Sequence, residues 1–261
     1  MVRVYPFGEG KTEEMVFKVL CTQYPDLNNV NLNKFVSVGG KNKFSEKIKE
    51  TLQADLIPDT EIQIVVFRDL DHGEIFDDVA QSFQNLAWIL LTKWNLTPQI
   101  KVHPEKPNIY ILQQQATTDT PGLRLVLHFP DDKIFDGLNV VMRNRTTDGY
   151  ILALGFDETI LRRFACKIKR DASTASQAPN VLRDLINTYI PNIVASNGIT
   201  FDQDKDFLAA YLCATRFWTV HRSEEQNKLA EVIMKRAAKY RPELLKQMFQ
   251  SWLDAIQMVV Q

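Results

Sequence analysis

The stretch VRVYPFGEGKTEEMVFKVL, residues 2–20, decides the fold. Its first apolar residues predict a β-strand, and the two glycines around Glu9 predict a tight turn. Thr12 is the predicted N-cap of the helix that follows. Glu13 and Glu14 then fall in the first helical turn, where the helix dipole favours negative charge. Glu9 is thereby placed at the carboxyl edge of a sheet, where open α/β folds locate their sites.

The GEGKT sequence within this stretch does not match a nucleotide-binding P-loop. That loop requires a glycine five residues before its Gly-Lys pair, so that backbone N–H groups can surround the phosphates. The corresponding position holds Tyr5, inside the predicted strand. A Walker-type nucleotide site at this turn is therefore excluded.

Composition limits the class of protein. The chain has 261 residues, of which 45% are hydrophobic, so it can bury a large core. Its formal net charge of −1 argues against binding nucleic acid through bulk charge. No apolar run approaches the roughly 20 residues of a membrane span, and no signal-peptide pattern opens the sequence. Three separated cysteines form no zinc or disulfide pattern. We therefore expect a cytoplasmic protein that does not enter membranes.

The first half of the chain alternates between strand and helix patterns. This alternation predicts an α/β fold with a mainly parallel, Rossmann-like sheet flanked by helices. The expected strands are residues 2–5, 34–38, 62–67, 108–112 and 123–129, and the expected helices in this half are 12–24, 44–56 and 79–94.

The second half is predicted to be helical. Residues 147–167 fit either a strand or a helix, and Thr147 as a potential N-cap favours the helix. Residues 172–176 form a small polar linker, and four further helices are expected at 181–194, 207–220, 224–240 and 243–260. We therefore expect an α/β domain at 1–135 and a mainly helical C-terminal extension at 136–261, packed on it.

Acidic residues follow two of the predicted strands. Glu9 follows the first, and Asp69 and Asp71 follow the strand at 62–67. Residues two apart in an extended segment point to the same side, so the two aspartates can converge. Three carboxylates on one sheet edge would repel one another unless neutralised. Oxygen ligands of this kind suit Mg²⁺ or Mn²⁺. Each carboxylate alone has an ordinary interpretation as a turn or loop residue.

Two motifs resemble those of the TOPRIM domain. GEGKTEE resembles its glutamate motif and VVFRDLDHGE its Asp-x-Asp motif, in the same order. The resemblance covers roughly the first 135 residues and implies a TOPRIM-like sheet. It also implies that Glu9, Asp69 and Asp71 bind Mg²⁺ or Mn²⁺ and carry catalysis, with proton transfer as a further role for Glu9. The short chain most resembles stand-alone prokaryotic TOPRIM proteins related to overcoming-lysogenization-defect nucleases.

The resemblance implies a metal-dependent phosphodiesterase that cuts DNA or RNA, with prokaryotic defence as its setting. A partner protein would supply any further activity. The chain lacks the strand-passage domain of a topoisomerase, the zinc-binding context of a primase and the ATPase of the lysogenization-defect nucleases. The alternative is a non-catalytic module that binds a nucleotide or nucleic acid and regulates another protein. Both interpretations stay open at this stage.

Other charged residues are candidates for accessory roles, although each is ordinarily a solvated surface or turn charge. The lysines could contact a phosphate backbone, and the acids could bind a second metal. They are Glu13, Lys11, Lys41, Lys43, Asp131 and Asp148.

The last predicted helices carry Trp252 and Ile256 on one stripe. We expect this stripe to pack on the chain's own sheet as a monomer, with a homodimer as the alternative.

Overall fold

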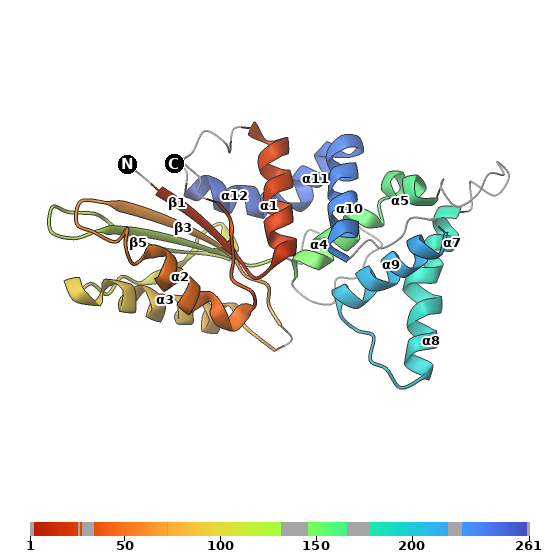
Figure 1. The fold of residues 1–261 in the computed structure, drawn as a ribbon, viewed down its shortest axis with the longest axis horizontal. Coiled ribbons are helices and arrows are strands. Elements are labelled where there is room, and N and C mark those ends of the chain that lie inside the picture. Colours follow the sequence, from red (N-terminus) through yellow and green to blue (C-terminus); the bar gives the residue numbers. More distant parts are fainter. Residues whose placement is uncertain are drawn as a thin grey trace. The chain divides into compact units, whose positions relative to one another are not determined.

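The computed structural model describes residues 3–25, 27, 34–71, 73–131, 146–165, 178–218 and 226–259. The chain divides into two compact units (Figure 1). The first comprises residues 1–131 together with 250–261, and the second comprises residues 132–249. The final helix therefore belongs to the unit that the N-terminal half builds. In the described parts of the chain, none of the helices has the length and apolarity to cross a bilayer.

A six-stranded, mostly parallel sheet forms the centre of the first unit, in the order β2-β1-β3-β6-β5-β4. The first three neighbouring pairs, from β2 to β6, are parallel, and β5 and β4 continue the sheet in antiparallel pairing. The predicted α/β class is thus confirmed. The strands are β1 (Arg3–Gly8), β2 (Val36–Ser37), β3 (Glu61–Phe67), β4 (Ile100–His103), β5 (Lys106–Gln114) and β6 (Gly122–His128).

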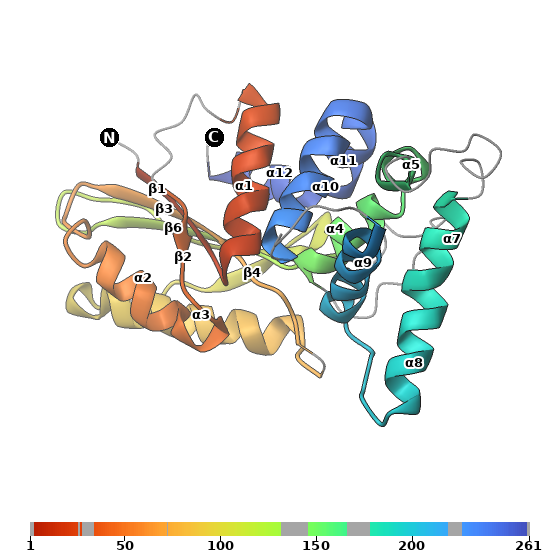
Figure 2. The ribbon, with the colours of Figure 1, turned by 45° about the vertical axis from the view of Figure 1, so that its right-hand side comes forward.

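One face of this sheet is covered by α2 (Phe44–Leu52) and α3 (Phe76–Leu91), as Figures 1 and 2 show. Each helix carries its apolar side chains at three- and four-residue spacing, which gathers them on one stripe. The strands contribute alternate residues to the same core, because successive side chains point to opposite faces. Ile62, Ile64 and Val66 of β3 accordingly belong to this core.

The opposite face is covered by α1 (Lys11–Gln23) and α12 (Gln250–Met258) (Figure 2). Phe67 lies on this face, with its ring centroid 3.7 Å from that of Trp252 and the two planes 7° apart. Trp252 and Ile256 are both fully buried. The prediction that their stripe packs on the chain's own sheet is therefore confirmed for α12.

Several predicted boundaries were wrong. The first strand extends to Gly8, because Pro6 and Phe7 continue the pairing with β3. Helix α1 has Gly10 rather than Thr12 as its N-cap, because the Glu14 N–H already bonds to the Gly10 carbonyl. Strand β4 was not predicted. The 3₁₀ turns η2 (Lys41–Lys43) and η3 (Thr92–Trp94) flank the helices of the first face.

All the regular elements described in the second unit are helices, and a loop at 197–203 separates α8 from α9. Its helices are α4 (Thr147–Gly155), α5 (Glu158–Ala165), α7 (Ala178–Asp184), the π-helical η5 (Leu185–Tyr189), α8 (Ile190–Ser196), α9 (Asp204–Trp218), α10 (Gln226–Tyr240) and α11 (Pro242–Met248). Pro242 lies in the first turn of α11, where proline is favoured. The predicted linker at 172–176 lies outside the described residues.

Helix α4 is the buried centre of this second unit. Nearly all of its side chains are inaccessible, and it packs against α9, α10 and α11. A helix that is apolar all round has no amphipathic signature, which explains why the sequence fitted a strand almost as well. Its N-cap is Thr146, whose side chain accepts the Gly149 N–H, and not the predicted Thr147.

Candidate functional site

The site lies where β1 and β3 end side by side. The two strands are parallel, and Gly8 is the register partner of Phe67. The next residues along each strand, Glu9 and Arg68, therefore emerge next to each other. Arg68 Nη1 donates to Glu9 Oε1 at 2.7 Å. The immediate neighbour of Glu9 is thus a cation, and Asp69 comes one residue later in the loop that follows β3.

Close packing requires the glycine that precedes Glu9. A Cβ added to Gly8 would lie 2.5 Å from Phe35 Cζ and 2.7 Å from Glu13 Cβ. Both distances are far below van der Waals contact, so any side chain here would displace α1 from the strand end. Gly8 therefore lets α1 begin directly against the edge that carries Glu9.

Arg68 links the two strand ends through a buried guanidinium whose side chain is only 6% exposed. Besides Glu9, it donates from Nη2 to both carboxylate oxygens of Glu74, at 2.9 and 3.0 Å. It also donates to the backbone carbonyl of Asp69. A buried charge must be paired and hydrogen-bonded to be tolerated, and these contacts meet that requirement.

Glu74 was not among the residues predicted from sequence, yet it connects most of the charged groups at this edge. Its Oε2 accepts the Asp71 N–H at 2.8 Å in addition to the Arg68 contacts. Gly73, with φ 85°, supplies the left-handed turn that returns the chain toward Arg68. The sequence signal was the Asp-x-x-Glu spacing in DHGE, which is typical of a side chain that accepts a backbone N–H three residues earlier.

A second cation, Lys41, reaches the same group of acids from the turn after β2. Its ammonium pairs with the Asp71 carboxylate and lies 3.6 Å from Glu74 Oε1. The turn itself is anchored to the site, because the N–H groups of Gly39 and Gly40 both donate to the Glu9 carbonyl, at 2.9 and 3.1 Å. The GGK sequence thus fixes Lys41 against the loop that follows β3.

The protonation of Glu9 is set by opposing effects. Burial raises the pKa of its carboxyl above the ordinary value, and the Arg68 charge partly offsets that rise. Glu13 adds a further upward contribution by repulsion. Glu13 itself is buried, and its Oε2 accepts the Gly10 N–H at 2.8 Å. The interpretation of Glu13 as a surface charge was wrong, because its carboxylate caps the first turn of α1.

The predicted carboxylates share one sheet edge, but this conformation directs two of them to cations. Glu9 pairs with Arg68, and Asp71 pairs with Lys41. Across the described ranges, no three His, Cys, Asp or Glu side chains are grouped closely enough to hold a metal ion. The oxygen donors present still match the chemistry of Mg²⁺ or Mn²⁺.

The accessory candidates are distributed around and beyond this edge. Lys11, at the start of α1, and Lys43, at the end of η2, are exposed. Asp131 follows β6, the strand next to β3, and so lies near the same edge. Asp148 belongs to α4 of the second unit. His72 lies outside the described residues.

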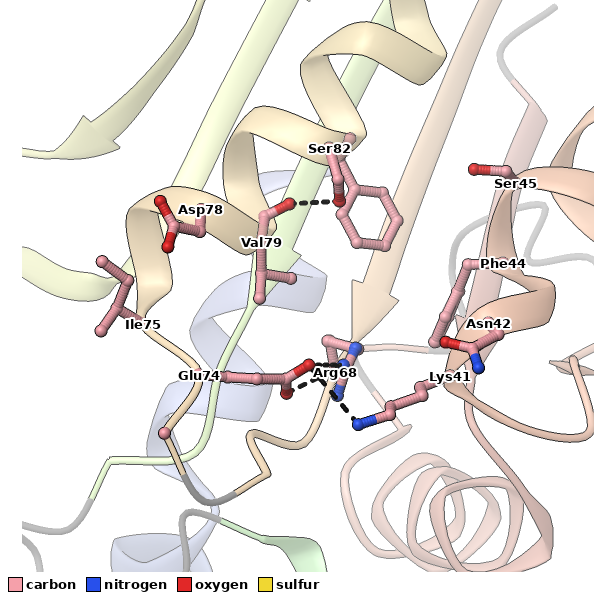
Figure 3. A pocket seen from close by; sticks show the side chains of 12 residues that line it. Lys41, Asn42, Phe44, Ser45, Arg68, Glu74, Ile75, Asp78, Val79 and Ser82 are labelled. Carbon is pink, nitrogen blue, oxygen red and sulfur yellow. Dashed lines mark hydrogen bonds and ion pairs between the residues drawn. The ribbon is translucent and has the colours of Figure 1, made fainter.

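A pocket of about 470 Å³ opens beside Arg68, between the starts of α2 and α3. Figure 3 shows side chains from the α2 side facing side chains of α3 across it, with Arg68 and Glu74 at one end. Lys41, Asn42 and Ser45 line the α2 side, and Asp78 and Ser82 line the α3 side. A volume of this size falls within the roughly 300–1,000 Å³ of small-molecule sites.

Comparison with known proteins supports the fold alone. No protein-family model matches the sequence, and no curated protein is significantly similar to it. One similar solved structure is the crystal structure of hypothetical protein PH0156 from Pyrococcus horikoshii OT3, with 15% sequence identity and a TM-score of 0.57. The match covers 100% of both chains. It shows that this arrangement of an α/β sheet with helices occurs in an experimentally determined structure.

Proposed function

We propose that the protein is a metal-dependent phosphodiesterase of TOPRIM type that acts on nucleic acid. The observation that carries the proposal is the pairing of β1 with β3, which places Glu9 and the Arg68-Asp69-Leu70-Asp71 segment at adjacent strand ends. Carboxylates at such an edge are suited to binding Mg²⁺ or Mn²⁺. The TOPRIM-like motifs GEGKTEE and VVFRDLDHGE contain these same residues.

Glu9, Asp69 and Asp71 would hold the ion, which when bound supplies Lewis-acid polarisation of a phosphodiester and of an attacking water. Two cations of the protein, Lys41 and Arg68, have a separate proposed role in binding the substrate phosphate. Lys41 and Arg68 lie at the same edge and line the neighbouring pocket. They can attract a phosphate group and orient it toward the carboxylates. The partly buried Glu9, whose pKa is raised, is suited to accept a proton from water.

Cleavage of labelled single- and double-stranded DNA and RNA in Mg²⁺ or Mn²⁺, with a chelator control, tests this function. We expect cutting that Glu9→Gln abolishes. Glu46→Gln, an exposed carboxylate on α2, is the matched control and should cut normally. Equal activity in wild type and Glu9→Gln would show that the cleavage comes from elsewhere and would overturn the assignment.

A second candidate is a regulatory module that binds a nucleotide or nucleic acid without cutting it. The observation that favours it is the pairing of Glu9 and Asp71 with Arg68 and Lys41, which leaves both carboxylates neutralised by the protein itself. This candidate predicts binding of oligonucleotides that is unchanged by chelator, with no cleavage in any divalent metal. Fluorescence anisotropy together with the cleavage assay separates the two functions.

A further inference from the structure

The pocket beside Arg68 combines three kinds of surface that one ligand would have to match. Two cations, Lys41 and Arg68, line one end of the pocket together with Glu74, which pairs with both of them (Figure 3). The apolar part of the wall includes Phe44 and Phe83, whose ring centroids are 5.6 Å apart in an edge-on arrangement. Ser82 contributes a hydroxyl from α3, and Asp78 lines the same side with its carboxylate directed away from Lys41 and Phe44 (Figure 3).

These surfaces favour a ligand with an anionic group, an apolar body and hydrogen-bond donors. Inorganic phosphate would have to compete with Glu74 and Asp71 for the two cations, and it would make no contact with the apolar wall. A nucleotide has all three parts. Its phosphate would compete with Glu74 and Asp71 for Lys41 and Arg68. The amino or imino groups of its base could donate to the Ser82 hydroxyl oxygen.

We propose that this pocket receives one unpaired nucleotide of the substrate, and that the protein therefore acts on single-stranded segments or ends in preference to duplexes. A paired base has its hydrogen-bonding edge occupied and its faces stacked, so it cannot enter a pocket between two helices without being extruded. An unpaired nucleotide avoids most of that cost. This proposal rests on the nucleic-acid function proposed above, and extends it to the substrate class.

Binding measured apart from cleavage tests the proposal. Fluorescence anisotropy would compare a short labelled single strand with its blunt duplex, in Ca²⁺ and in chelator, and unlabelled nucleoside monophosphates and phosphate would serve as competitors. We expect the single strand to bind about tenfold more tightly than the duplex. A nucleoside monophosphate should compete better than phosphate alone. Equal affinity for strand and duplex, or equal competition by phosphate, would overturn the proposal.

Matched tryptophan variants on α3 locate the binding. Ser82→Trp fills the pocket, whereas Asn85→Trp places the same side chain at an exposed position of α3 that does not line it. We expect Ser82→Trp to weaken single-strand binding about tenfold and Asn85→Trp to leave it unchanged. Identical binding by the two variants would show that the pocket is not used. Circular dichroism establishes that both variants are folded.

The outcomes separate this proposal from the proposed function. If Ser82→Trp retains metal-dependent cleavage and full single-strand affinity, the nuclease stands and the nucleotide pocket fails. If wild type cuts nothing in any metal but Ser82→Trp still weakens single-strand binding, the pocket stands and the nuclease fails.

Discussion

Arg68 donates to Glu9 at 2.7 Å, although the two residues are 59 positions apart in the sequence. The contact follows from the parallel register of β1 and β3, which brings Glu9 opposite Arg68. The protein therefore neutralises the Glu9 carboxylate with its own cation. Any metal that binds Glu9 has to compete with this guanidinium.

Removing the guanidinium should destabilise the first unit strongly. Arg68→Met leaves Glu9 and Glu74 without their shared partner, and breaking a buried pair in this way costs roughly 3–5 kcal/mol in the free energy of unfolding. Both acids are about one quarter exposed, so we expect the lower end of that range. Urea unfolding measures the loss.

Lys18→Met is the matched control for that substitution. Lys18 pairs with Glu14 on the surface of α1, where its side chain is 65% exposed. Exposed helical pairs of this kind contribute only about 0.3–0.5 kcal/mol. If both variants lost equally little stability, the Arg68 contacts would be surface-like and the buried network would not exist as described.

Metal binding should be detectable by thermal unfolding. Mg²⁺ or Mn²⁺ that binds the folded state raises the melting temperature of the wild type, and Asp69→Asn should lose most of that response.

Lys41→Gln frees Asp71 from its exposed ion pair. Such pairs contribute roughly 0.2–1 kcal/mol, so the apparent metal affinity should rise by up to about fivefold. A wild type indifferent to both metals would argue for the non-catalytic candidate.

Much of the first unit was predictable because its signals are local. The apolar run before Phe67 and the glycines around Glu9 identify two strand ends without any knowledge of tertiary contacts. The pairing register of the strands has no such local signal, because it depends on which residues of two distant strands align. A shift of one residue exchanges Arg68 for Asp69 as the neighbour of Glu9. The sequence therefore located the edge but not the cation that occupies it.

The sequence alone could not show which surface covers the apolar stripe of α12. Its apolar stripe required a covering surface, and either the chain's own sheet or a second copy would have satisfied the pattern. The stacking of Trp252 on Phe67 shows which surface it uses. The helices before it belong to the other unit, so a boundary based on composition could not follow the chain back to the sheet.

Trp252 should be essential for the stability of the sheet unit. Trp252→Ala removes a fully buried aromatic side chain, and such truncations cost about 3–5 kcal/mol in the free energy of unfolding. Trp252→Phe preserves the ring stacked on Phe67 and should recover much of the loss. Urea unfolding followed by circular dichroism tests both. A Trp252→Ala variant as stable as wild type would contradict the packing of α12 on the sheet.

Asp148 should make the second unit less stable as pH rises through the range from 4 to 6. Burial, followed by repulsion from Asp204, raises the pKa of its carboxyl from 3.8 to about 6. The folded state thus binds the proton more tightly than the unfolded state, and stability falls until the group is ionised. The shift corresponds to a loss of roughly 3 kcal/mol in the free energy of unfolding at pH 7. Asp148→Asn should remove this pH dependence, which urea unfolding at pH 4 and pH 7 would show; an unchanged difference would assign it to other groups.

His128 should produce the opposite pH dependence in the first unit. Its ring is fully buried at the end of β6, with Nε2 2.9 Å from Ser251 Oγ of α12. Its Nδ1 has no hydrogen-bond partner among the described residues, so protonation would place an unsatisfied charge in the core.

Burial lowers the pKa of His128 from 6.5 to about 3. The unfolded state therefore binds the proton first, and stability falls as pH drops below 6.5. Between pH 7 and pH 4.5 the loss should be roughly 2–3 kcal/mol in the free energy of unfolding. His128→Gln keeps an amide that can bond to Ser251 but does not titrate, so its stability should be nearly constant over this range. Urea unfolding of wild type and variant at the two pH values measures the difference. Parallel losses in both proteins would mean that other groups titrate and that His128 stays neutral without a stability cost.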